Sequence, residues 1–283
     1  MFSEHHFEIT PKKNPFQLNL RELWQYRDLV VLFVRRDFVA TYKQTILGPI
    51  WFFIQPVFTT FVFTLVFGKF GGLSPDGVPT FLYYLAGIIL WNYFSDCLVK
   101  TSNTFTENQG LFGKVYFPRL TVPLSIIISN LIKFGVQFLL FLCLWIYYLI
   151  RGELVFNGTI FLFPVQVIIM ALLGMGSGII ISALTTKYRD LRFLLQFGIQ
   201  LLMYVTPGVI MSYDSIVSKF PQFKWLADIN PIYPVIETFK HGWIASGSFS
   251  WEGIILSSVI TVITLLSGIV IFNRTEQNFM DTV

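Results

Sequence analysis

Charged side chains are scarce in this sequence of 283 residues, because Asp, Glu, Lys and Arg together make up only 13% of it. A soluble domain usually carries about a quarter of its residues as charged side chains. Hydrophobic residues account for 54% of the chain, and they include 31 Phe, 12 Tyr and 7 Trp. The composition therefore argues against a water-soluble protein and indicates an integral membrane protein with aromatic residues at its interfaces.

Histidine and cysteine are rare, which removes the usual ingredients of catalytic and metal sites. The three histidines, His5, His6 and His241, do not form an HExxH motif, and no GxSxG turn occurs. Cys97 and Cys143 lie in separate apolar runs without CxxC spacing, so neither a disulfide framework nor a metal site is expected. We expect no catalytic residue, no metal and no cofactor in this chain, and no enzyme activity of its own.

A nucleotide-binding loop is also missing. The run GMGSG, residues 174–178, lacks the lysine and the strand-to-helix context of GxxxxGK[ST]. Its GxxxG spacing instead favours close packing between two transmembrane helices. The net charge of +4 could suggest nucleic acid, but the basic residues are scattered among apolar runs. We therefore expect no nucleic-acid partner.

Six apolar stretches are long enough to span a membrane, since a spanning helix needs about 20 mainly apolar residues. They cover residues 47–67, 81–99, 124–150, 159–184, 193–211 and 251–272. The sequence thus predicts an all-α membrane protein with its transmembrane domain over 47–272. An N-terminal segment, 1–46, precedes this domain and a short tail, 273–283, follows it.

The basic residues predict how the chain is oriented. Six spans put both termini on one side of the membrane, and Lys and Arg are concentrated in the connections on that side. Loops on the cytoplasmic side of a membrane carry the excess of Lys and Arg. Both termini are therefore predicted to be cytoplasmic, and the long connection around 212–250 is predicted to face outward.

Two ionisable residues, Asp96 and Lys133, lie within the predicted spans. Charges inside a membrane are costly and raise the question of a functional role. Both lie toward the cytoplasmic ends of their spans, where a side chain can reach water. Three interpretations stay open, namely a role in transport, a structural pair between two helices, or separate contact with water.

The N-terminal segment predicts an amphipathic helix. Between residues 20 and 38, apolar residues recur with roughly helical spacing, at Leu20, Leu23, Trp24, Leu29, Leu32, Phe33 and Phe38. Aromatic residues flanked by arginines are typical of a helix that lies in the headgroup plane. A soluble helix packed on a partner protein is the alternative.

Four segments of the chain carry a recognisable set of motifs. They are RRDFVATYKQTILGPIWFFIQP (35–56), NQGLFGKVYFPRLTVPLS (108–125), KYRDLRFLLQFGIQLLMYVTP (187–207) and NPIYPVIETFKHGWIASG (230–247). In this order and spacing they resemble the membrane subunits of type-2 ABC exporters, the group that moves lipid-linked polysaccharides such as O-antigen, capsule and teichoic acid. Gly208 departs from the pattern, because many relatives have a branched residue there.

The resemblance implies a permease subunit in the bacterial cytoplasmic (inner) membrane. Two such subunits would form the channel, and two copies of a separate ATPase would supply ATP and Mg. The cargo would be a lipid-linked polysaccharide similar to O-antigen; teichoic acid, capsule, or a drug or lipid are alternatives. A secondary carrier and a membrane-embedded glycosyl- or acyltransferase are further alternatives, disfavoured by the few buried charges and by the missing catalytic residues.

The resemblance also implies roles for individual segments. The N-terminal helix corresponds to an interface helix, residues 104–116 to a coupling helix that contacts the ATPase, and 213–224 and 231–245 to two short re-entrant helices. The implied ATPase-coupling residues are Arg35, Arg36, Asp37, Lys43, Glu107, Phe112, Lys114 and Arg119. Replacing Lys114 or Phe112 with Asp is expected to uncouple ATP hydrolysis from export without affecting membrane insertion.

Aromatic residues on the spans are candidates for the channel wall. Their ring faces can stack on the C–H surfaces of sugars through many weak contacts, which would let a polymer slide. The residues expected to line the channel are Trp51, Tyr83, Tyr84, Trp91, Tyr93 and Tyr204.

Overall fold

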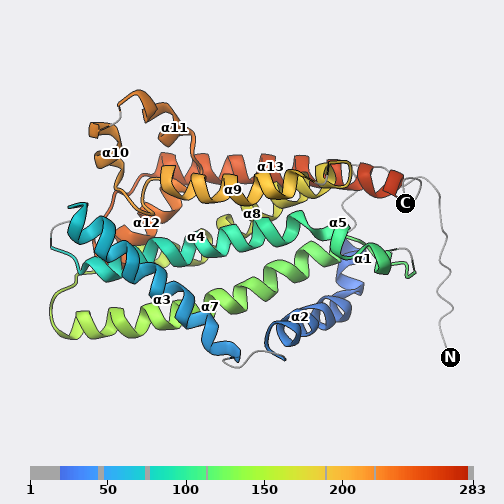
Figure 1. Cartoon of the computed structure of the whole chain (residues 1–283), viewed down its shortest axis with the longest axis horizontal. Coiled ribbons are helices and arrows are strands. Elements are labelled where there is room, and N and C mark those ends of the chain that lie inside the picture. Colours follow the sequence, from blue (N-terminus) through green and yellow to red (C-terminus); the bar gives the residue numbers. More distant parts are fainter. Residues whose placement is uncertain are drawn as a thin grey trace.

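The computed structural model describes residues 20–43, 48–73, 77–112, 114–188, 190–219 and 221–279. Within these ranges every regular element is a helix, and this confirms the all-α prediction. The longer helices lie alongside one another in a bundle (Figure 1). The sequence predictions for residues 1–19, 44–47, Gly113 and 280–283 lie outside the described residues.

Five helical stretches of the described chain have the length and composition to cross a membrane. The first, Gly48–Phe70, joins a 3-10 turn (Gly48–Ile50), the helix α3 (Trp51–Phe63) and a π-helical segment (Thr64–Phe70). The others are α4 (Thr80–Ser102), α7 (Thr121–Ile150), α8 (Phe163–Thr185) with the 3-10 turn Gly158–Leu162 before it, and α13 (Trp251–Phe279). They correspond to five of the six predicted spans.

The helix at the remaining predicted span is shorter than expected. Helix α9 covers Leu191–Val205, 15 residues, whereas hydropathy predicted a span to residue 211. Such a helix rises about 22 Å, less than the roughly 30 Å of a hydrocarbon core. It ends because Thr206, which precedes a proline, is extended (ψ 116°), and Gly208 then takes a left-handed conformation (φ 84°).

Small residues let helix α8 pack closely on both of its neighbours. A Cβ atom added at Gly174 would lie 2.8 Å from the Cβ of Cys97 on α4, and one at Gly178 would lie 2.7 Å from the Cβ of Thr101. On the other side of α8, a Cβ at Gly176 would lie 2.8 Å from the Cα of Leu265 on α13. The predicted GxxxG packing is therefore confirmed, and α8 forms the centre of the bundle.

The predicted N-terminal helix is two helices, α1 (Leu20–Gln25) and α2 (Arg27–Tyr42). Helix α2 packs against α7 and buries Val30 and Phe33. Two residues of the predicted apolar face, Trp24 and Leu32, are 69% and 60% exposed in the single chain. The buried side of α2 therefore faces the bundle, while other apolar side chains of this helix are exposed at its surface.

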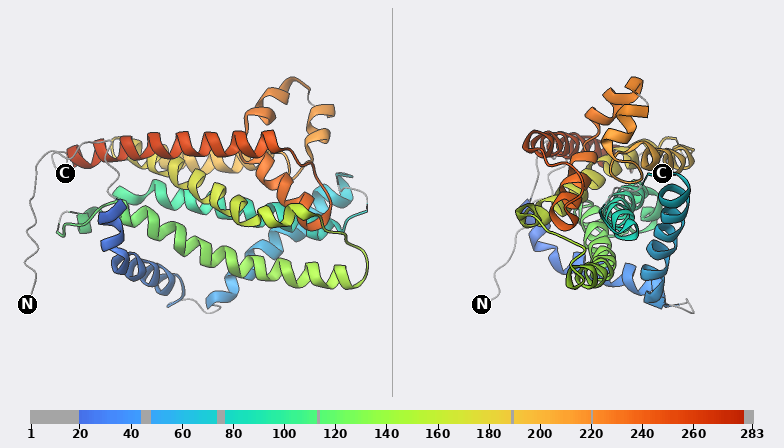
Figure 2. Two further views of the ribbon diagram at one scale, coloured as in Figure 1. Left: turned by 180° about the vertical axis from the view of Figure 1, so that it is seen from behind. Right: turned by 90° about the vertical axis from the view of Figure 1, so that its left-hand side faces the viewer.

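Short helices cover the opposite end of the bundle. The predicted helix 213–224 is divided into α10 (Tyr213–Lys219), a 3-10 turn that begins at Pro221, and α11 (Lys224–Ile229). The second predicted helix, 231–245, is observed as α12 (Tyr233–Ile244). Helices α10–α12 lie at one end of the molecule, whereas α1, α2, α5 and the last turns of α13 lie at the other (Figures 1 and 2).

Candidate functional site

The connection between α4 and α7 forms a compact structure at the end of the molecule that carries α2. It contains the short helices α5 (Thr104–Glu107) and α6 (Gln109–Phe112). The backbone N–H of Phe105 donates a hydrogen bond to the Ser182 hydroxyl (3.4 Å), and the Thr185 hydroxyl donates to the carbonyl of Ser102 (3.2 Å). These bonds fix the connection to the end of α8.

An aromatic cluster joins this connection to two other helices. Phe105 stacks on Phe272 of α13, with ring centroids 4.5 Å apart. Phe112 contacts Phe105 (6.0 Å) and Phe117 (5.7 Å), and Phe117 contacts Phe33 of α2 (5.7 Å). Because these rings are buried, a displacement of the connection would be passed to α2 and α13 through packed side chains.

The outer surface of the connection is formed by other residues. Glu107 and Lys114 are exposed, as the coupling prediction requires. Val115 (57% exposed) and Tyr116 (67% exposed) extend the same surface, and the Tyr116 hydroxyl donates to Glu22 on α1 (3.4 Å). The sequence prediction missed these two residues, although tyrosine is enriched at protein interfaces.

Two of the residues predicted to contact the ATPase are buried instead. Phe112 is 3% exposed and Arg119 is 9% exposed, and the guanidinium of Arg119 lies over the Phe112 ring (5.3 Å). An Asp at position 112 would place a carboxylate in the aromatic cluster, which is costly. Phe112→Asp is therefore expected to disturb the packing of the connection, so a loss of export in this variant would not report on coupling alone.

The remaining predicted coupling residues lie on α2 and directly after it. Arg35, Arg36 and Lys43 are exposed. Arg36 forms an ion pair with Asp37 (2.8 Å) and lies over the ring of Phe33 (4.8 Å). Through Phe33, these contacts join the charged surface of α2 to the aromatic cluster that packs the connection between α4 and α7.

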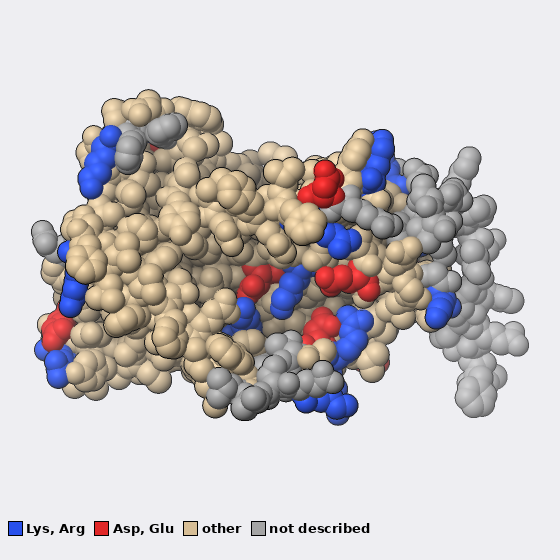
Figure 3. Space-filling model, in the orientation of Figure 1, with Lys and Arg blue, Asp and Glu red and all other residues tan. Residues whose placement is uncertain are grey.

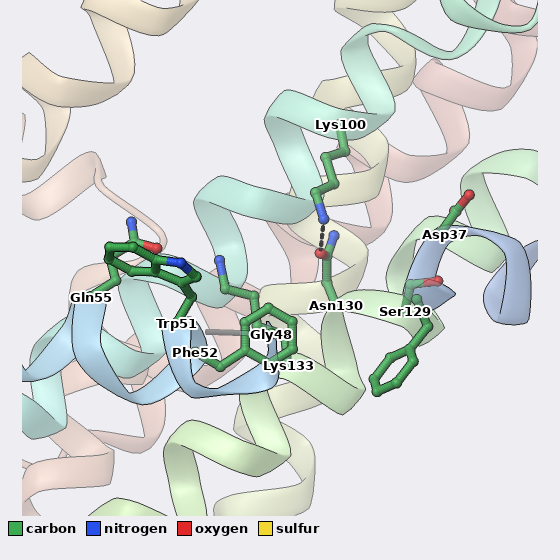
Figure 4. Close-up of a pocket in the computed structure, with 10 residues that line it drawn as sticks. Asp37, Gly48, Trp51, Phe52, Gln55, Lys100, Ser129, Asn130 and Lys133 are labelled. Atoms are coloured by element: carbon green, nitrogen blue, oxygen red, sulfur yellow. Dashed lines mark hydrogen bonds between the residues drawn. The ribbon is translucent and has the colours of Figure 1, made fainter. Parts of the chain in front are cut away.

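A cavity of about 430 Å³ lies where the end of α2 and the start of α3 approach α4 and α7 (Figure 4). Charged groups of both signs lie side by side in a recess of the face shown in Figure 3, whose other charged groups lie toward the two ends of the molecule. Lys133 pairs with Asp96 (2.6 Å) and Lys100 donates to the Asn130 side-chain oxygen (2.9 Å). Of the three interpretations of Asp96 and Lys133, the structure supports a pair between two helices.

The residues predicted to line a channel fall into two groups. Tyr83, Tyr84, Trp91 and Tyr93 on α4 are at most 3% exposed within the single chain, and this favours a packing role. Trp51 on α3 and Tyr204 on α9 are 50% and 49% exposed. Only the last two are placed so that they could meet a substrate directly.

Two charged residues of α12 are buried at the opposite end of the molecule. Glu237 accepts a hydrogen bond from the backbone N–H of Ser248 (3.0 Å), and the ammonium of Lys240 lies 3.2 Å from the ring centroid of Tyr83. Burial raises the pKa of Glu237 and lowers the pKa of Lys240. The sequence prediction missed Glu237 and Lys240, although two charged residues three apart in a predicted re-entrant helix are a signal.

Glu237 also explains the unusual glycine at position 208. A Cβ atom on Gly208 would lie 2.8 Å from the Glu237 carboxylate, and the backbone there has a positive φ. A branched residue would be strained in this conformation.

Among the residues that the structure describes, no group of His, Cys, Asp and Glu side chains could hold a metal ion.

Comparison with known proteins places these features in a wider context. Residues 28–242 match the family described as ABC-2 type transporter. The chain is 25% identical over 265 residues to the O-antigen export system permease protein RfbA of Myxococcus xanthus, covering 93% of this chain and 98% of that protein. It is also 25% identical over 256 residues to RfbA of Klebsiella pneumoniae, covering 90% of this chain and 94% of that protein.

Proposed function

The chain belongs to the ABC-2 type transporter family, and from this premise we propose that it is the permease of an exporter of lipid-linked polysaccharide similar to O-antigen. As a multi-pass membrane subunit of a transporter, it works with an ABC ATPase. The similarity to O-antigen export permeases along nearly the whole chain supports this cargo. Capsule and teichoic acid are the alternative cargoes.

The connection between α4 and α7 carries the proposal for how ATP hydrolysis is coupled to transport. Its exposed residues, including Lys114 and Tyr116, offer a surface to a separate ATPase that binds ATP and Mg. Its buried rings join that surface to α2 and α13. Movement of the ATPase would thus tilt α2 and, through it, the first crossing that follows along the chain.

A homodimer with two ATPase subunits is the proposed assembly. Helices α3 and α9 keep most of their apolar side chains exposed in the single chain, which is consistent with a second copy or lipid covering them. Trp51 and Tyr204 would then be able to contact the sugar polymer along a channel between the copies.

The inner membrane, with both termini in the cytoplasm, is the proposed location. The position of α1, α2 and the end of α13 at the same end of the molecule (Figure 1) supports a common side for the two termini. The concentration of Lys and Arg in the connections at that end supports the cytoplasmic side.

Lys114→Asp tests both the coupling surface and the cargo. The permease would be reconstituted with its ATPase in proteoliposomes, and export of labelled lipid-linked O-antigen would be measured together with ATP hydrolysis. We expect export to fall at least about tenfold, which corresponds to about 1.4 kcal/mol of lost coupling, while the inserted protein stays constant. The matched control is Lys219→Asp, which makes the same charge change on exposed α10 at the other end.

Equal losses in the two variants, or full export by Lys114→Asp, would contradict the coupling proposal. Failure of the unaltered permease to move O-antigen while it moves a teichoic acid or capsule precursor would contradict the cargo and leave the coupling surface intact.

A further inference from the structure

We propose that the cavity between α2, α3, α4 and α7 binds the phosphate group of an anionic membrane lipid. The cavity has a volume of about 430 Å³ and its lining includes Lys100, Lys133, Ser129 and Trp51. It therefore combines basic, hydroxyl and aromatic groups in one hollow (Figure 4).

Among the described residues that line the cavity, Lys100 is the basic residue that no carboxylate contact neutralises. Lys133 is neutralised by Asp96 (2.6 Å), and Asp37 is neutralised by Arg36 (2.8 Å). Lys100 instead donates to the neutral side-chain oxygen of Asn130 (2.9 Å). An ammonium group has three N–H donors, so Lys100 can hold an anionic oxygen while it keeps this bond.

A hydroxyl group adds a second donor to the cavity. The Ser129 Oγ atom is buried and, among the residues that the structure describes, has no hydrogen-bond partner. Such an atom usually finds a partner, and a phosphate oxygen in the cavity could accept its proton. Asn130 of α7 is 1% exposed. It accepts the hydrogen bond from Lys100 of α4 and so positions this lysine at the same site.

The aromatic rim favours a lipid over a free anion. Trp51 is 50% exposed and stands at the start of the first crossing, and Phe52 lines the cavity beside it. Indole rings prefer the headgroup level of a bilayer. A lipid could place its phosphate beside Lys100 and its glycerol and upper chains against these rings, which an inorganic ion could not do.

The depth of the cavity agrees with this occupant. It lies where α2 ends and the first crossing begins, and Figure 1 shows these two helices meeting at an angle. A helix on the membrane surface that leads into a crossing would place the cavity at the headgroup level. Basic pockets between transmembrane helices on the cytoplasmic side bind anionic headgroups in other proteins. The inference does not depend on the exported cargo, because lipid binding is measured without transport.

The test is a binding titration of the full chain in neutral detergent with radiolabelled short-chain phosphatidylglycerol. We expect Lys100→Gln to weaken binding at least about tenfold and Lys100→Arg to restore most of it. The matched control is Lys187→Gln, which removes an exposed lysine outside the cavity, and its affinity should stay within about twofold of the unaltered chain.

Three results would overturn the proposal. One is unchanged affinity in Lys100→Gln, and another is equally tight binding of zwitterionic phosphatidylcholine. The third is displacement of the lipid by inorganic phosphate at the same concentration, which would identify a site for a free anion. Should Lys100→Gln fail to fold, Ser129→Ala, which removes the second donor, should weaken binding at least about threefold, and unchanged affinity in this variant would also overturn the proposal.

Discussion

Helices α4 and α8 differ sharply from α3 and α9 in what covers them. In the most apolar stretch of each crossing, 78% of the α4 residues and 67% of the residues in the α8 crossing are buried, compared with 17% in the crossing that contains α3. Helix α9 has Ile199 as its buried residue, while Phe193 is 77% and Phe197 is 60% exposed.

This difference separates the part of the bundle that is complete in one chain from the part that is not. Helices α4 and α8 meet through glycines and bury their side chains against the same chain. The apolar faces of α3 and α9 need lipid or another protein surface beside them. Substitutions on the first pair should therefore affect stability, and those on the second should affect assembly.

The largest expected effect is that of Gly178→Ala at the contact between α4 and α8. The new Cβ would lie 2.7 Å from the Cβ of Thr101 and 2.8 Å from the carbonyl oxygen of Leu98. Overpacking of this kind costs about 2 kcal/mol, so the thermal midpoint in detergent should fall by several degrees.

Gly198→Ala on α9 is the matched control, because no atom lies within 4 Å of the added Cβ. Alanine favours a helix over glycine by up to about 1 kcal/mol, so the midpoint should stay unchanged or rise. A fall of equal size in both variants would break the distinction between the two pairs of helices.

Most helices, and the close packing of the GxxxG run of α8, could be predicted from the sequence, because a GxxxG pattern is a local signal; that α4 is the neighbour at Gly174 and Gly178 came from the structure. The end of α9 could not, because hydropathy counts apolar side chains and does not weigh the turn that Pro207 and Gly208 impose. The break at Tyr26 between α1 and α2 has no comparable signal in the sequence.

At the candidate site, the resemblance pointed to particular segments but not to which side of each segment faces outward. Phe112 is buried while Lys114, two residues later, is exposed, and no spacing rule applies in such a short connection. The pairing of Asp96 with Lys133 depends on how two helices are rotated toward each other, and the sequence left that open. The presence of Glu237 and Lys240 in a predicted re-entrant helix could be read from the sequence, but their burial is a property of the tertiary structure.

Asp96→Asn should lower stability less than Gly178→Ala does. It tests how far the ion pair between Asp96 of α4 and Lys133 of α7 contributes to the contact between these helices. The change removes the carboxylate that pairs with Lys133, whose side chain is 16% exposed. Since both groups keep some contact with solvent, the loss of stability should be about 1 kcal/mol. The double variant Asp96→Asn/Lys133→Gln removes both charges, and its thermal midpoint should recover most of the loss. A double variant less stable than the single one would contradict a simple pair.

The smallest effect on stability is expected from Phe197→Ala, which tests the exposed side of the comparison. Because this ring is 60% exposed in the single chain, its removal should change the free energy of unfolding by less than about 0.5 kcal/mol. If α9 lies against a second copy, the fraction of crosslinked dimer in membranes should nevertheless fall.

Phe161→Ala is the control, because that ring is 86% exposed and lies before α8 rather than on α9. It should leave both the free energy of unfolding and the fraction of crosslinked dimer unchanged. A thermal midpoint lowered as far as in Gly178→Ala would mean that α9 is packed within its own chain, and the division between self-contained and partner-dependent helices would have to be withdrawn.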